Sequence, residues 1–217
     1  MKNKYTPKYY DQSEEKINVI THAFGMFLSI VALVLLLTKA NSVGNVWHVV
    51  SFSIYGCSLL ILYSASTFFH ASKNLKLRQR LNIFDHASIY VLIAGTYTPF
   101  TLVTLHGNTG WWMFVVVWSL ALIGIVLKFF FTGKYDKIST LMYVLMGWII
   151  VFAIKTLINN LGVEGSLWLL SGGLLYTIGA IFYSIQRIKY NHAIFHVFVL
   201  LGSFTHFISI YNYVILT

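Results

Sequence analysis

The sequence predicts an all-α integral membrane protein with seven transmembrane helices. Of the 217 residues, 58% are hydrophobic and only 10% are charged, whereas a soluble domain averages about 25% charged residues. The apolar residues are gathered into stretches of about 20, which is long enough for a helix to cross a bilayer. The seven expected spans cover residues 17–38, 47–69, 84–105, 111–131, 138–158, 166–185 and 193–216.

The connections between these spans are short, so we expect no second domain. The first span, residues 17–38, is longer than the apolar core of a signal peptide. No convincing small-residue cleavage site follows it, and we expect it to be retained. Residues 1–16 are predicted to form a cytoplasmic tail, and residues 17–217 a single transmembrane domain.

Three features characterise individual spans. Tryptophans occur near the predicted outer ends of the second, fourth and sixth spans, as in an interfacial aromatic belt: Trp47, Trp111, Trp112 and Trp168. In the third span, Pro99 predicts a kink, because proline removes a helical hydrogen-bond donor. In the sixth span, three glycines predict close packing against a neighbouring helix: Gly172, Gly173 and Gly179.

The formal net charge of +9 is distributed asymmetrically along the chain. Of the 15 Lys and Arg residues, 13 fall on one side of the predicted spans: Lys2, Lys4, Lys8, Lys16, Lys73, Lys76, Arg78, Arg80, Lys128, Lys134, Lys137, Arg187 and Lys189. Only Lys39 and Lys155 fall on the other side. Because excess Lys and Arg marks the cytoplasmic face, this predicts a cytoplasmic N-terminus and an external C-terminus. The basic charge is therefore a topology signal, and we expect no nucleic-acid partner.

Polar side chains recur at the cytoplasmic ends of three predicted spans. Ser66 and His70 lie one turn apart at the end of the second span, Asp85 lies at the start of the third, and His192 and His196 lie one turn apart at the start of the seventh. Polar groups at membrane depth are costly and usually functional. Histidines at positions i and i+4 face the same side of a helix and can offer two imidazole nitrogens to one ion, a familiar arrangement for zinc.

With His70 as a third ligand, the set His70, His192 and His196 would leave one coordination position of a zinc ion open. Open zinc sites are typical of catalysis, because a bound water is acidified to a pKa of about 7. Asp85 is then the candidate general base or water-orienting group, and Ser66 the candidate hydrogen-bond donor to water or a substrate oxygen. The chain has no His-Glu-x-x-His sequence, which excludes the ordinary metalloprotease pattern.

Each of these residues also has a simpler interpretation. The histidine pair can be interfacial, bonding backbone carbonyls; Asp85 can cap its helix; Ser66 can bond back to its own helix. The metal site is favoured because it explains residues from three spans at one depth together. Five of the eight histidines stay outside the predicted ligand set: His22 in the first span, His86, which points away from Asp85, His206, a packing residue, and the interfacial His48 and His106.

Taken in order, four motifs resemble the pattern of the bacterial hemolysin III proteins: Glu15-x2-Asn18-x3-His22, Ser66-x3-His70, Asp85 and His192-x3-His196. That family is similar to the progestin and adipoQ receptors (adiponectin receptor-like proteins) and, more distantly, to the alkaline ceramidases. The resemblance covers essentially the whole chain beyond the N-terminal tail. It implies a seven-helix bundle that holds zinc on the histidines matching His70, His192 and His196, with Asp85 near a zinc-bound water.

The resemblance implies several functions. Ceramide hydrolysis in the wider group favours a zinc-dependent hydrolase of a lipid amide or ester, or a lipid-responsive protein on the same scaffold. The family name suggests a pore-forming or cytolytic protein instead. A third alternative is a regulator of membrane lipid homeostasis, in which zinc clamps the second and seventh helices. We expect zinc as cofactor, a membrane lipid or fatty-acyl substrate, and a place in the bacterial cytoplasmic (inner) membrane, with no oligomeric state predicted.

Overall fold

The structure, a computed structural model, describes residues 7–43 and 46–214. Within these residues every regular element is helical. Six of the described helical stretches are long and apolar enough to cross a membrane. The chain is thus an all-helical, multi-pass membrane protein, as the sequence predicts. Lys2 and Lys4 of the expected tail, and the last residues of the expected seventh span, lie outside the described residues.

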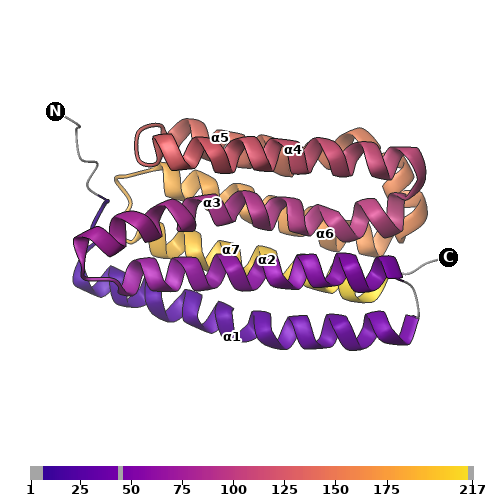
Figure 1. The fold of residues 1–217 in the computed structure, drawn as a ribbon, viewed down its shortest axis with the longest axis horizontal. Helices are drawn as coiled ribbons and strands as arrows, with labels where there is room; N and C mark the ends of the chain where they lie inside the picture. The colour runs from indigo at the N-terminus through magenta and orange to yellow at the C-terminus, as the bar shows by residue number, and fades with distance from the viewer. Residues whose placement is uncertain (1–6, 44–45, 215–217) are drawn as a thin grey trace.

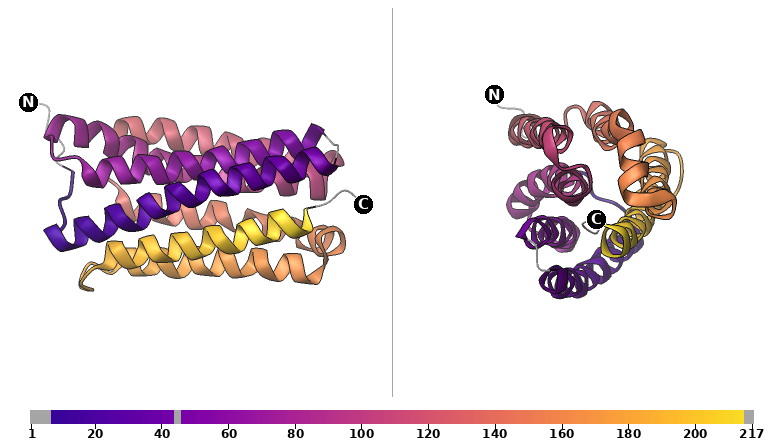
Figure 2. Two further views of the ribbon diagram at one scale, coloured as in Figure 1. Left: turned by 90° about the horizontal axis from the view of Figure 1, so that it is seen from below. Right: turned by 90° about the vertical axis from the view of Figure 1, so that its right-hand side faces the viewer.

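The helices run side by side along one long axis (Figure 1). In chain order they are α1 (Gln12–Val43), α2 (Val46–Ala71), α3 (Leu75–Pro99), the π-helix η1 (Phe100–Leu105), α4 (Gly107–Phe131), α5 (Asp136–Gly147), the 3-10 helix η2 (Ile149–Ala153), α6 (Ile154–Ser184) and α7 (Asn191–Tyr213). The end-on view in Figure 2 shows them arranged around the bundle axis, with α7 returning beside α1.

Helix α3 is the most enclosed helix of the described bundle. The most apolar window of the stretch Leu75–Leu105 is 83% buried, against 50% or less in the other five stretches. This helix begins nine residues before the expected span, because the Asn74 side chain caps it by accepting a hydrogen bond from the Leu77 amide at 3.1 Å. Asp85 consequently lies about three turns inside α3, and the interpretation of Asp85 as a helix cap is wrong.

The irregularity expected at Pro99 is a change of helix type. Proline ends α3, and the next six residues, Phe100–Leu105, form a π-helix whose members are all buried. Because proline has no N–H, the regular ladder of i to i−4 hydrogen bonds is interrupted at this position. A π-helical turn is one of the recognised causes of helix distortion.

The longest helical stretch, Asp136–Ser184, contains a sharp break at Gly162. Its backbone there has φ +77° and ψ 167°, in a region that favours glycine because an L side chain would be strained. Figure 1 shows this stretch turning back at the end of the bundle opposite the start of α1. The break therefore separates two oppositely directed arms, one containing α5 and the other the C-terminal part of α6.

Two of the three glycines of the sixth predicted span lie at close helix contacts. A Cβ atom on Gly172 would lie 2.0 Å from Cδ2 of His206, and one on Gly179 would lie 2.8 Å from Cβ of Phe198. Both neighbours belong to α7, so these glycines let α6 and α7 approach closely. The same expectation is wrong for Gly173, where a Cβ would make only ordinary contact, 3.7 Å from Trp148.

The two adjacent glycines give a matched test of this packing. We expect Gly172→Ala to lower thermal stability in detergent, since overpacking of this kind typically costs about 1–3 kcal/mol. Gly173→Ala should leave the unfolding temperature close to that of the unmodified protein. Unfolding followed by fluorescence-detected size exclusion after heating measures both variants, and equal stability of the two would contradict the assigned contact.

Candidate metal centre

Three histidines meet at the end of the bundle where α1 begins. His70 lies in the last turn of α2, and His192 and His196 lie one turn apart at the start of α7. Their exposed fractions are only 4%, 7% and 1%. Fully enclosed imidazoles do not fit the alternative of interfacial side chains that reach toward the membrane surface.

The Nε2 atoms of these histidines point at one another. Nε2 of His192 lies 3.1 Å from Nε2 of His70 and 3.0 Å from Nε2 of His196. An imidazole nitrogen has either one proton or one lone pair in the ring plane, so Nε2 of His192 can form only one of these two contacts as a hydrogen bond. Nitrogens bound to one tetrahedral zinc at about 2.1 Å would be about 3.4 Å apart. The triad could therefore hold a metal ion after small shifts of the rings.

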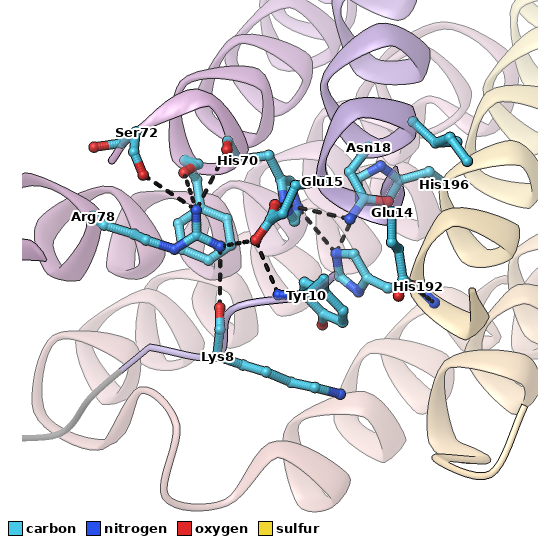
Figure 3. Close-up of polar contacts among 12 residues, drawn as sticks. Lys8, Tyr10, Glu14, Glu15, Asn18, His70, Ser72, Arg78, His192 and His196 are labelled. Carbon is cyan, nitrogen blue, oxygen red and sulfur yellow. Dashed lines mark hydrogen bonds and ion pairs between the residues drawn. The ribbon is translucent and has the colours of Figure 1, made fainter. Parts of the chain in front are cut away.

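The second nitrogen of His70 is fixed by a carboxylate from α1. Nδ1 of His70 lies 2.7 Å from Oε2 of Glu15, while Oε1 of Glu15 is paired with the guanidinium of Arg78 (Figure 3). A carboxylate at Nδ1 favours a proton on that nitrogen and leaves the Nε2 lone pair free to bind a metal ion. Arg78 is only 1% exposed and also donates to the carbonyls of Phe69 and Ser72, at 3.2 and 3.3 Å.

Other side chains of α1 contact the remaining histidines. The hydroxyl of Thr21 lies 3.4 Å from Nδ1 of His196, and Oε1 of Glu14 accepts a hydrogen bond from the backbone amide of His192 at 3.3 Å. His22 stacks on His196 with ring centroids 3.5 Å apart and an angle of 10°. Helix α1 thus supports the triad without contributing one of its three members.

Asn18 completes this supporting layer. It is fully buried, and its side-chain amide lies 3.5 Å from Nδ1 of His70. Glu15, Asn18 and His22 are spaced three and four residues apart, which places them on one face of a helix. The first motif of the sequence pattern therefore lies against the histidines that the other motifs supply.

A short N-terminal strap, residues 8–11, crosses the triad. The ring of Tyr10 stacks on His192 with centroids 4.5 Å apart, and its amide donates to Oε1 of Glu15 at 3.1 Å. The carbonyl of Lys8 accepts a hydrogen bond from Arg78 at 3.1 Å. Burial raises the pKa of Tyr10 above its usual value, because the charged phenolate is disfavoured there.

Ser66 and Asp85 line a cavity beside the triad. This cavity, of about 530 Å³, is bounded mainly by apolar side chains of α3, α5, α6 and α7, and also by His192 and His196; it is called the apolar cavity below. Ser66 is 1% exposed and lies next to Asp85. Its hydroxyl interacts with the Asp85 carboxyl group and makes no hydrogen bond to a backbone carbonyl of α2, so Ser66 does not bond back to its own helix.

Sequence reasoning missed two members of the site and misplaced one histidine. In the sequence, Arg78 counts only as one of the topology charges, and Tyr10 lies in the predicted tail. No sequence motif marks either residue as part of the site. His48, expected at the interface, is fully buried, whereas His106 is exposed. His206 packs as expected, with Nε2 3.0 Å from the carbonyl of Leu169.

The first test of the triad is its metal content. We expect detergent-purified protein to contain close to one zinc ion per chain, measured by inductively coupled plasma mass spectrometry. The triple variant His70→Ala, His192→Ala, His196→Ala should lose it, because all three nitrogen ligands are removed. His106→Ala, an exposed histidine outside the cluster, is the control. Metal-free protein after incubation with zinc would contradict the assignment.

Glu15 gives a second, finer test. Glu15→Gln removes the carboxylate that fixes Nδ1 of His70, and losses of this kind typically weaken metal binding by about 10–100-fold. Competition with a chromogenic zinc chelator measures the change. Glu164→Gln, which alters a carboxylate bonded to Tyr213, should bind metal like the unmodified protein. An unchanged affinity in folded Glu15→Gln protein would remove Glu15 from the site.

Comparison with known proteins identifies relatives over nearly the whole chain. Residues 10–207 match the family model described as "Haemolysin-III related". The chain is 47% identical over 204 residues to "Hemolysin-3" of Bacillus cereus, covering 94% of this chain and 93% of that protein. It is 48% identical over 200 residues to "Hemolysin-3 homolog" of Bacillus subtilis (strain 168), covering 92% and 94%.

The likeness extends to animal proteins. The chain is 30% identical over 216 residues to human "Monocyte to macrophage differentiation factor", covering 97% of this chain and 87% of that protein. The order of motifs noted in the sequence, the helical fold and these matches all agree. The chain belongs to the haemolysin III family of membrane proteins.

Proposed function

We propose that this protein is a metal-dependent hydrolase, with zinc as the metal, that cleaves an amide or ester bond of a membrane lipid. The observation that carries the proposal is that one cavity, the apolar cavity, is lined by Asp85 and Ser66 and also by His192 and His196. A large pocket with convergent polar groups at one side is typical of an active site. A lipid acyl chain would fit into the apolar part of this cavity.

A divalent ion bound to the triad would supply a Lewis acid that polarises a carbonyl and acidifies a water molecule. Asp85, half-buried and on the same cavity, would accept the proton of the attacking water and return it to the leaving group. The hydroxyl of Ser66 lies beside Asp85, and it would turn to donate a hydrogen bond to the acyl oxygen as negative charge develops.

We also propose that the chain crosses the membrane seven times. The stretch Asp136–Ser184 has 49 residues, which as a straight helix would be about 74 Å long, more than twice the roughly 30 Å of the bilayer core. The break at Gly162 supports two crossings within this stretch. Together with the five other candidate spans, this makes seven.

An odd number of crossings puts the two ends of the chain on opposite sides of the membrane. The excess of Lys and Arg at the end where α1 begins supports a cytoplasmic N-terminus. Residues 1–16 would then lie on the cytoplasmic side and residues 17–217 would form one membrane domain. The bacterial relatives favour the cytoplasmic membrane as its location.

Two alternatives rest on different observations. A regulator of membrane lipids with a structural metal is supported by the position of the triad, which would tie α2 to α7 as a clamp. A pore-former is suggested by the names of the bacterial relatives. A pore needs a water-lined path across the bilayer, and the mainly apolar lining of the apolar cavity favours hydrolysis over this alternative.

Asp85→Asn separates hydrolysis from a structural metal. We expect this variant to retain its metal but to release fatty acid from ceramides or phospholipids about 10²–10⁴ times more slowly, the usual contribution of a general base. Mass spectrometry of released fatty acid measures the rate. Glu164→Gln, at an exposed carboxylate bonded to Tyr213 and outside the motifs, the strap and the triad, should hydrolyse at the unmodified rate.

The opposite result has a clear meaning. If metal-loaded protein releases no fatty acid from either lipid class, the hydrolase proposal fails while the metal site stands. Rescue of altered membrane fluidity in a deletion strain by Asp85→Asn would then favour the regulator.

A further inference from the structure

A second cavity meets the apolar cavity beside the triad, where His192 lines both. It has a volume of about 520 Å³ and a more polar lining, and it is called the polar cavity below. Six residues line both cavities: Asp85, His86, Asp136, Thr140, Tyr183 and His192. The candidate metal centre therefore lies at the junction of the apolar cavity and the polar cavity. An amphiphilic ligand, with one apolar and one polar part, requires such a junction.

Three lysines from separate segments line the polar cavity. Lys8 belongs to the N-terminal strap, Lys134 to the turn between α4 and α5, and Lys137 to the start of α5. The Nζ atom of Lys8 is held by Oε1 of Gln186 at 2.8 Å and lies 4.6 Å from the ring centroid of Tyr10. That ring in turn stacks on His192, so the Lys8 ammonium is one aromatic ring away from the triad.

The charges around this cavity favour an anion. Asp85 and Asp136 are the carboxylates among its lining residues, against the three lysines. A metal ion on the triad would add further positive charge at the inner end of the cavity. Lys134 and Lys137 are exposed, so their ammonium groups are free to reorganise around an incoming group.

We propose that the polar cavity is a head-group site for an anionic amphiphile, whose acyl chain occupies the apolar cavity. The head group would be a carboxylate or a phosphate, and Lys8, Lys134 and Lys137 would bind it. This inference adds the charge class of the substrate, or of its acyl product, to the proposed function. It rests on the proposed function for the position of the bond that is cleaved. Binding itself requires neither the metal ion nor hydrolysis.

The competing explanation is that these lysines serve topology alone. The loop between α2 and α3 and the first turns of α3 provide a matched control, since Lys73, Lys76 and Arg80 are exposed basic residues at the same end of the bundle. None of these three lines either cavity. Removing three positive charges from one group or the other separates a binding site from a general surface charge.

The experiment measures ligand affinity by native mass spectrometry of protein in neutral detergent. Three probes share one acyl chain and differ in the head group: a fatty acid, a lysophosphatidic acid and a neutral monoacylglycerol. Inorganic phosphate is the fourth probe and has no acyl chain. We compare the unmodified protein with the triple variant Lys8→Gln, Lys134→Gln, Lys137→Gln. We expect this variant to bind the anionic probes about tenfold more weakly, since each exposed ion pair contributes roughly a factor of 1.4–5.

The control variant Lys73→Gln, Lys76→Gln, Arg80→Gln should bind all probes like the unmodified protein. Monoacylglycerol affinity should not change in either variant, and inorganic phosphate should bind far more weakly than lysophosphatidic acid. Preference for one anionic probe identifies the head group as carboxylate or phosphate. Equal losses in both triple variants, or no loss in the cavity variant, would overturn the head-group site.

The same measurement distinguishes this inference from the proposed hydrolase. The variant His70→Ala, His192→Ala, His196→Ala removes the metal ligands but leaves the three cavity lysines in place. Selective binding of anionic probes by this variant supports the head-group site even where no lipid is hydrolysed. Hydrolysis without a preference for anionic probes would support the enzyme and remove the head-group site.

Discussion

The carboxylate of Glu15 is the contact on which the geometry of the histidine triad depends. One oxygen lies 2.7 Å from Nδ1 of His70 and the other is paired with Arg78. A buried guanidinium is costly without a partner, and Arg78 is 1% exposed. Glu15 therefore serves two needs at once. It neutralises a buried cation of α3, and it directs the Nε2 lone pair of His70 toward His192 and His196. Through this one side chain α1, α2 and α3 are fixed relative to one another.

Helix α1 acts as the scaffold of the site. It supplies no member of the triad, yet its side chains contact all three histidines: Glu15 and Asn18 at His70, Glu14 at the amide of His192, and Thr21 and His22 at His196. Ligand rings held from outside in this way keep their orientation when an ion enters or leaves. These contacts explain why the motif Glu15-x2-Asn18-x3-His22 accompanies the motifs that supply the triad histidines in the sequence.

The all-helical fold and the convergence of the histidines could be predicted from the sequence for physical reasons. Apolar stretches of about 20 residues have few alternatives to membrane helices, and i, i+4 spacing fixes a shared helix face. The burial of Arg78 could not be predicted, because its partner Glu15 is 63 residues away and a charge count treats every arginine alike. The early start of α3 depends on the Asn74 cap, a local signal that the hydrophobic pattern of the span does not contain. Gly162, where the helical stretch breaks, lies in the interval 159–165 that the hydropathy pattern leaves between the fifth and sixth expected spans.

The hydrolysis that we propose would explain why the triad lies near one end of the bundle. Hydrolysis consumes water, and the bilayer core contains almost none, whereas the acyl chains of lipids are found only there. A site at one end of the bundle can meet both requirements if each reactant has its own compartment. The triad is at most 7% exposed, so in the proposed reaction water and lipid would reach it through the cavities that join at Asp85 and His192. The strap over His192, tied to Glu15 and Arg78, closes the direct path from the end of the bundle. Access from the aqueous side would then run through the polar cavity past Lys8, and the lysines of that cavity would be the first to contact a charged group that enters or leaves.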